Sequence, residues 1–141
     1  MRFIPASIDL ALLLLRVWVG GSMLLLHGWP KILAFQEKAA TFADPLGIGP
    51  QASYTLAVLG EAGASVLLII GLFTRLGAVL GGVTMAVAFF IAHGGKLSGT
   101  GSGELAFLYL GAYVALFLAG GGFFAVDMKL AAKSPEVPRT V

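Results

Sequence analysis

The feature that most constrains the fold is an almost unbroken apolar run from Tyr54 to Leu72, with one carboxylate, Glu61, near its middle. A helix of about 20 apolar residues is long enough to cross the hydrocarbon core of a bilayer. An ionisable side chain at that depth costs about 2.5–3.5 kcal/mol on insertion scales. Glu61 is therefore expected to have a cationic partner or to line a polar cavity inside the membrane.

The composition is also that of a membrane protein. Of the 141 residues, 58% are hydrophobic and 11% are charged, whereas soluble domains have about 25% charged residues. Four spans of about 20 residues use most of this length, so no soluble catalytic unit is expected. Because the chain has no cysteine, disulfides, thiolate catalysis, iron–sulfur clusters and cysteine-bound zinc are excluded.

The apolar runs predict an all-α fold, an integral membrane, antiparallel bundle of four transmembrane helices. Helices suit this setting because each one satisfies its backbone hydrogen bonds internally. The chain is expected to be a single membrane domain over residues 1–141, ending in a polar cytoplasmic tail at 127–141. The predicted spans cover about residues 10–26, 53–72, 76–92 and 104–119.

Two further patterns concern packing and the membrane interface. Residues 29–42 mix aromatic, aliphatic and charged side chains, which is typical of an amphipathic stretch at headgroup depth. The third predicted span carries small residues at helical spacing, which let two helices approach closely. These small residues are Gly77, Gly81, Ala88 and Ala92. Aromatic residues within the spans, Trp18, Tyr109 and Tyr113, are interpreted as packing or lipid-facing side chains.

Lysine and arginine counts predict the orientation of the spans. The side with both termini holds five basic residues, Arg2, Arg75, Lys129, Lys133 and Arg139, and the opposite side holds Lys31, Lys38 and Lys96. This bias places both termini in the cytoplasm. The first apolar run is expected to stay in the mature protein, because Arg16 interrupts it and no small-residue cleavage pattern follows.

Arg16 is the predicted partner of Glu61. Arg16 lies about seven residues into the first span and Glu61 about eleven residues from the same side in the second, a difference in depth of about 6 Å. An arginine side chain bridges that distance, which predicts an intramembrane ion pair. This pair has two possible roles: it locks two helices together, or it borders a cavity for a ligand or proton.

A second polar group is expected at the outer ends of the spans, where His27, Lys31, His93 and Glu104 come to one level. Histidine titrates near neutral pH and donates hydrogen bonds to carbonyls, as binding of a quinone head group requires. The alternative is that these residues are ordinary interfacial side chains, and the helix dipole alone favours Glu104 at a helix start. Nothing in their spacing is diagnostic of a haem or metal site, and no metal is predicted.

Several short motifs in the same order resemble the DoxX family of small four-helix integral membrane proteins. They are Leu13 to Arg16, His27-Gly28 with Lys31, Glu61 with Gly63, Gly71 to Arg75, Met85, and Gly122 to Asp127. The resemblance covers nearly the whole chain. The family residues that carry over are Arg16, His27, Lys31, Glu61, Arg75 and Asp127, of which Arg75 and Asp127 are expected to make polar contacts on the cytoplasmic side.

The resemblance implies a multi-pass protein of the bacterial inner membrane. Some DoxX-like proteins are small subunits of thiosulfate:quinone oxidoreductase, so the expected function is a membrane subunit or partner of an oxidoreductase system that meets the quinone pool. Quinone is the one candidate cofactor, and whether the chain is itself an enzyme stays open. The alternatives are a non-catalytic membrane scaffold or assembly factor and, less favoured, a small transporter, because four short helices leave little material for alternating access.

The expected partners follow from the same reasoning. They are the lipid bilayer, an oxidoreductase partner protein and a second copy of this chain. The net charge of +2 rests on few residues, and basic residues at a membrane surface explain it. No nucleic-acid partner is expected.

Overall fold

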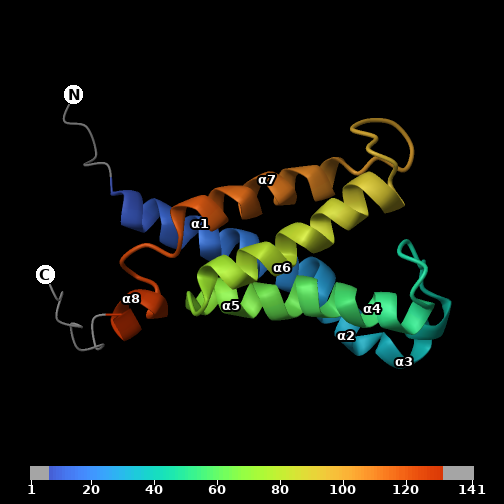
Figure 1. Cartoon of the computed structure of the whole chain (residues 1–141), viewed down its shortest axis with the longest axis horizontal. Coiled ribbons are helices and arrows are strands. Elements are labelled where there is room, and N and C mark those ends of the chain that lie inside the picture. The colour runs from blue at the N-terminus through green and yellow to red at the C-terminus, as the bar shows by residue number, and fades with distance from the viewer. Residues whose placement is uncertain (1–6, 132–141) are drawn as a thin grey trace, which may run out of the picture.

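In a computed structural model, residues 7–131 are described, and they form helices joined by turns and short loops (Figure 1). Three segments, η1, η3 and η4, are π-helical, and η2 is a 3₁₀ turn. The elements are α1 (Ile8–Met23), η1 (Leu24–Gly28), α2 (Trp29–Leu33), α3 (Phe35–Lys38), η2 (Ala39–Thr41), α4 (Pro50–Val58), η3 (Leu59–Gly63), α5 (Ala64–Ile70), α6 (Thr74–Ala86), η4 (Val87–Ala92), α7 (Glu104–Ala119) and α8 (Val126–Ala131).

Three continuous helices within the described residues are long and apolar enough to cross a membrane. They run over Ile8–Leu33, Pro50–Ile70 and Thr74–Ala92, with 26, 21 and 19 residues. The apolar helix α7 has 16 residues, or about 24 Å of length, somewhat short of a hydrocarbon core of about 30 Å. The all-α membrane class is therefore confirmed, and a fourth crossing by α7 stays a prediction.

The first helix is longer than its predicted span of 10–26. Residues 29–33, expected at the interface, continue the helix through η1 and α2 to Leu33. Pro30 does not stop it, because it directly follows the π-helical segment η1, and local π-helical adjustments let a membrane helix accommodate a residue without a backbone N–H. At the other end of the chain, the first residues of the predicted polar tail belong to α8, and residues 132–141 lie outside the described part.

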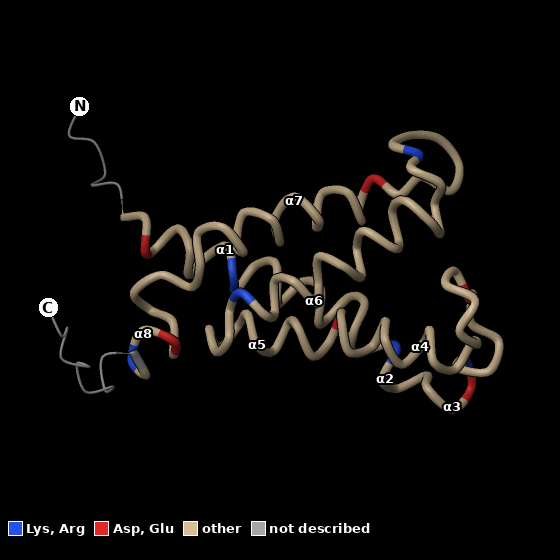
Figure 2. Tube along the Cα trace, in the orientation of Figure 1, with Lys and Arg blue, Asp and Glu red and all other residues tan. Residues whose placement is uncertain are grey.

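The long helices lie side by side and alternate in direction (Figure 1). The start of α1, the turn from α5 to α6, and α8 share one end of the molecule, called here the terminal end. The loops that follow α3 and η4 lie at the opposite end, called here the loop end. Figure 2 shows that most charged residues lie toward these two ends and that few lie along the middle of the helices.

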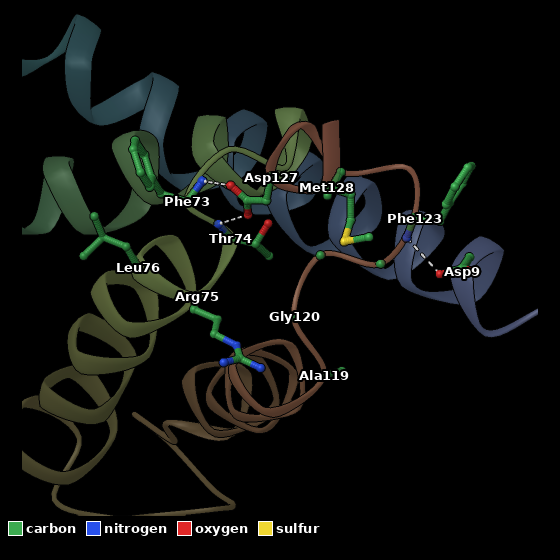
Figure 3. Close-up of a pocket in the computed structure, with 13 residues that line it drawn as sticks. Asp9, Phe73, Thr74, Arg75, Leu76, Ala119, Gly120, Phe123, Asp127 and Met128 are labelled. Carbon is green, nitrogen blue, oxygen red and sulfur yellow. Dashed lines mark hydrogen bonds between the residues drawn. The ribbon is translucent and has the colours of Figure 1, made fainter. Parts of the chain in front are cut away.

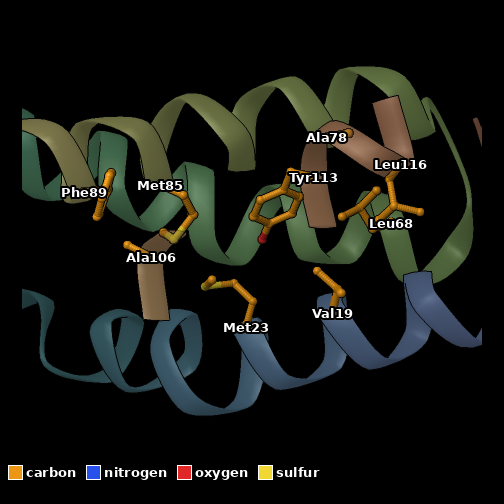
Figure 4. Packing of buried hydrophobic residues seen from close by; sticks show 9 residues of the cluster. All are labelled: Val19, Met23, Leu68, Ala78, Met85, Phe89, Ala106, Tyr113 and Leu116. Carbon is orange, nitrogen blue, oxygen red and sulfur yellow. The ribbon is translucent and has the colours of Figure 1, made fainter. Parts of the chain in front are cut away.

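The core is a cluster of apolar side chains contributed by α1, α5, α6, η4 and α7 (Figure 4). The Tyr113 ring packs directly on Gly81, because a Cβ atom built there would lie 2.5 Å from the ring Cζ. A Cβ atom at Gly77 would lie 3.1 Å from the Cβ atom of Leu67. The predicted close packing at these two glycines is therefore confirmed. The core residues are Val19, Met23, Leu68, Ala78, Met85, Phe89, Ala106, Tyr113 and Leu116.

Candidate functional site

The polar centre of the molecule is an ion pair between Lys31 of α2 and Glu61 of η3. The Lys31 Nζ atom lies 2.5 Å from Glu61 Oε2, and this is the one ion pair found in residues 7–131. The Glu61 side chain is 9% exposed and that of Lys31 is 24% exposed. The pair thus joins the first two long helices, with the glutamate side chain buried and the lysine side chain partly exposed.

Arg16 is not the partner of Glu61, so the predicted Arg16–Glu61 pair is wrong. Arg16 is fully buried, and its Nη1 atom donates to the Leu68 carbonyl at 3.2 Å. The register of the two antiparallel helices explains the difference, because a Cβ atom at Gly28 would lie 2.9 Å from Ala62. Glu61 is therefore level with residues about twelve positions, or about 18 Å, beyond Arg16.

The backbone of Lys31 is held by an aromatic cluster at the start of the second long helix. Tyr54 Oη donates to the Lys31 carbonyl oxygen at 2.8 Å. The Tyr54 ring packs edge-to-face against Phe35 and Phe42, with centroid distances of 5.4 and 5.0 Å. Such ring pairs add packing energy to the area they bury. The cluster fixes α2 against α4 and so fixes the position from which the lysine side chain reaches Glu61.

Glu61 lies where three helices approach closely. A Cβ atom at Gly60 would overlap Thr84 Oγ1 of α6, so glycine is required for this contact. Within the same helix, the Ser65 hydroxyl, one turn further along, donates to the Glu61 carbonyl oxygen. Glu61 belongs to the π-helical segment η3, which packs against the π-helical segment η1. Single π-helical turns are rare and are frequent at functional sites.

His27 lies in η1, one helical turn before Lys31. Residues at this spacing share a helix face. The half-buried imidazole packs edge-on against Tyr109, with a centroid distance of 6.1 Å. Tyr109 Oη in turn donates to Ser22 Oγ at 2.8 Å. The first long helix therefore has a polar face that runs from Ser22 through His27 to Lys31.

The four residues of the predicted outer pocket are divided between two places. Lys31 binds Glu61, whereas His93 Nδ1 lies 3.0 Å from the Gly101 carbonyl oxygen in its own loop. Glu104 is exposed at the start of α7, which lies apart from α2 (Figure 1). Within residues 7–131, no hydrogen bond or ion pair joins any two of the four. No group of three His, Asp or Glu side chains in this part of the chain is placed to hold a metal ion.

The sequence pattern did not predict a polar contact for Tyr54, and Tyr109 was predicted to be a packing or lipid-facing aromatic residue. Both hydroxyl groups make hydrogen bonds between helices. The available signal was their residue type, since a tyrosine in an apolar helix usually finds a partner for its hydroxyl group. The pattern of the sequence does not say which partner that is.

At the terminal end, Asp127 holds the turn between α5 and α6. Its two carboxylate oxygens accept from the backbone N–H groups of Phe73 and Thr74, at 2.7 and 2.9 Å. Burial raises the pKa of Asp127, but these two donors, the nearby Thr74 hydroxyl group and the positive charge of Arg16 together outweigh it, and the pKa lies below its ordinary value. Arg75 makes no ion pair in the described chain, and its guanidinium group points toward the end of α7 (Figure 3).

Comparison with known proteins identifies related sequences. The DoxX family model matches residues 11–94, which include His27, Lys31 and Glu61. A protein of Haemophilus influenzae described as uncharacterized is 36% identical over 117 residues, which cover 76% of this chain and 81% of that protein. No solved structure matches the chain.

Proposed function

Because the chain belongs to the DoxX family of membrane proteins, we propose that it is a small membrane component of an oxidoreductase system and binds a quinone head group beside Lys31 and Glu61. The observation that carries this proposal is the ion pair itself, with a buried glutamate side chain and a partly exposed lysine side chain. Intramembrane charges of this kind are costly and commonly mark ligand or proton sites.

The chemistry of Lys31 fits a carbonyl ligand. An ammonium group has three N–H donors, and Glu61 accepts one of them. The lysine side chain is 24% exposed, and a further acceptor is proposed to bind at the open side of the pair. A quinone head group offers two carbonyl oxygens, and a hydrogen bond from a charged donor is stronger than one from a neutral donor.

The surroundings of the pair fit a lipid-soluble ligand. Leu25 and Leu26 precede the site and are 68% and 67% exposed on the surface of an apolar helix. Such a surface faces lipid in a spanning helix and offers contacts to an isoprenoid tail. His27, one turn from Lys31, supplies a second hydrogen-bonding group on the same face.

In the proposed function, this chain and its oxidoreductase partner protein have different roles. A bound quinone supplies two-electron redox chemistry, and the electrons come from a partner protein. In the chain itself, Lys31 orients the carbonyl oxygen and Glu61 holds the ammonium group in place. The site is proposed to work in the bacterial inner membrane, in a chain with four crossings and both termini in the cytoplasm.

Thermal unfolding in mild detergent tests the proposal, because a ligand that binds only the folded state raises the unfolding temperature. A short-chain ubiquinone is the probe, and Lys38→Gln in α3 is the matched control for Lys31→Gln. We expect the quinone to stabilise the wild type and Lys38→Gln but not Lys31→Gln. Equal stabilisation of all three, or of none, contradicts the site. A copurified partner protein without quinone stabilisation favours the scaffold alternative.

A further inference from the structure

We infer that a hollow at the terminal end binds the headgroup of a phospholipid that carries both a phosphate and a primary ammonium group. The hollow has a volume of about 680 Å³ and lies between the α5–α6 turn, the end of α7, α8 and the start of α1 (Figure 3). It is separate from the Lys31–Glu61 site, which lies further along the helices toward the loop end. The inference does not depend on quinone binding.

The depth of the hollow suits a headgroup. It surrounds the turn at which the helix Pro50–Ile70 ends and the helix Thr74–Ala92 begins. When both helices cross the membrane, this turn lies at the boundary between the hydrocarbon core and the headgroups. A phospholipid in the adjacent leaflet therefore has its polar part at the level of the hollow.

The phosphate side of the inferred site is formed by Arg75 and Thr74. Arg75 is exposed, lines the hollow and has no ion-pair partner in residues 7–131. The planar guanidinium group suits phosphate because it presents two parallel N–H donors. Thr74 is 1% exposed and also lines the hollow, and its hydroxyl group lies close to the Asp127 carboxylate without forming a well-aligned hydrogen bond.

The start of α6 adds further donors for a phosphate. Asp127 accepts from the N–H groups of Phe73 and Thr74. The next two amides, of Arg75 and Leu76, belong to the first helical turn, in which N–H groups have no acceptor four residues earlier. Helix N-termini of this kind favour anions. Thr74, Arg75 and Leu76, which carry these groups, all line the hollow.

The opposite charge in the hollow favours a zwitterionic ligand. Asp9 lines it and is exposed, and its Oδ1 atom accepts from the Phe123 N–H at 2.8 Å. Asp127 is a second carboxylate in the same lining. A purely anionic headgroup would leave the exposed Asp9 carboxylate without a cationic partner. A primary ammonium group donates hydrogen bonds to a carboxylate, which a quaternary ammonium group lacks the N–H to do.

The walls of the hollow also provide apolar surface for an acyl chain. Phe73, Leu76 and Phe123 line it and are 61%, 51% and 66% exposed. A lipid whose phosphate contacts Arg75 would place the start of its acyl chains beside these side chains.

Native mass spectrometry in mild detergent tests the inference. Phosphatidylethanolamine, phosphatidylcholine and phosphatidylglycerol are added in equal amounts, and the lipid retained by the folded protein is measured. We expect the wild type to retain phosphatidylethanolamine in preference to the other two. Arg75→Gln should weaken this retention about tenfold, the size of one charge-assisted hydrogen bond. Asp9→Asn should reduce the preference for phosphatidylethanolamine over phosphatidylcholine.

Two controls separate a specific site from general effects. Lys96→Gln removes an exposed positive charge at the loop end and should leave retention unchanged. Arg75→Lys keeps the charge and should retain more phosphatidylethanolamine than Arg75→Gln, which guards against a simple loss of folding. Equal retention of all three lipids by the wild type, or full retention by Arg75→Gln, shows adventitious lipid only and overturns the inference. Preference for phosphatidylglycerol overturns the assignment of a zwitterionic ligand.

Discussion

Lys31 and Glu61 depend on each other because each is charged in surroundings that disfavour a lone charge. The Glu61 side chain is 9% exposed and lies in the middle of an apolar helix of 21 residues. Removing one partner of a buried pair leaves the other uncompensated, which costs more than the pair itself contributes. The two residues should therefore behave as a unit.

We predict that Lys31→Met lowers the free energy of unfolding by about 3 kcal/mol, because it leaves a buried carboxylate unpaired. Lys31→Met combined with Glu61→Leu should recover most of that loss. Unfolding in mixed detergent micelles measures the free energy of unfolding of the wild type and of these two variants. Arg16→Leu combined with Glu61→Leu is the comparison, and its two effects should add within about 0.5 kcal/mol because these residues lie far apart. Stronger coupling of Glu61 to Arg16 than to Lys31 contradicts the register described above.

Asp127→Ala should reduce stability by about 1 kcal/mol, the size of a lost helix cap. The pKa of Asp127 is lowered in the folded protein from its ordinary value of 3.8, so the folded state holds this proton less tightly than the unfolded chain. Its stabilisation is therefore complete above that value and is lost as the pH falls through the lowered pKa. Thermal unfolding of wild type and variant at pH 7 and at pH values well below 3.8 measures this; a difference in stability that stays the same throughout would count against the mechanism.

At the residue scale, the sequence identified the unusual side chains but not their partners. Glu61 and Lys31 are conspicuous because they interrupt or border apolar runs. The pairing depends on helix register, which is determined by contacts such as Gly28 on Ala62. These contacts involve small residues without a directional signal in the sequence. An estimate of depth from span boundaries therefore selected Arg16, although the first helix extends past residue 26 to bring Lys31 to Glu61.

At the scale of the helices, close approach at glycine positions the site. Gly60 touches Thr84 of α6, whereas a Cβ atom at Gly63 in the same segment would meet nothing within 4 Å. Sequence periodicity predicted the close contacts of α6, because Gly77 and Gly81 lie at helical spacing. The same pattern did not predict the π-helical turns or the extension of the first helix, which depend on packing between η1 and η3.

Gly60→Ala should destabilise the protein by about 1–3 kcal/mol through overpacking against α6. Gly63→Ala is the matched control in the same π-helical turn and should be neutral or slightly stabilising, since alanine favours helix. Thr84→Ala should recover part of the loss in Gly60→Ala by removing the hydroxyl group that overlaps. Thermal unfolding of the wild type, Gly60→Ala, Gly63→Ala and the combination of Gly60→Ala with Thr84→Ala measures this. Equal effects of the two glycine substitutions argue against the contact between Gly60 and Thr84.

At the scale of the whole molecule, the arrangement in the membrane follows from three long apolar helices and a shorter fourth. The apolar composition was sufficient to predict the all-α membrane class. It was not sufficient to predict where each helix ends, because α7 has 16 residues and is followed by Gly120 with a positive φ of 76°. The segment after Gly120 folds back to Asp9 and the α5–α6 turn, contacts that depend on the tertiary structure.

Single cysteines can report the sidedness of this chain, which has none of its own. Ser7→Cys and Lys129→Cys should react with a membrane-impermeant maleimide from one side, and Ala43→Cys and Ser98→Cys from the other. This outcome requires four crossings, with α7 as the fourth. Labelling of intact cells and of inverted vesicles measures it. Reaction of Lys129→Cys from the same side as Ser98→Cys would show that α7 does not cross.

The most direct test of the central claim is photolabelling of the protein in native membranes with an azidoquinone, followed by mapping of the labelled peptides. We predict labels concentrated on the segments around His27 to Lys31 and Leu59 to Gly63, and lost in Lys31→Gln but kept in Lys38→Gln. Labels spread evenly over the lipid-facing helices, or unchanged in Lys31→Gln, would contradict a quinone site at the Lys31–Glu61 pair.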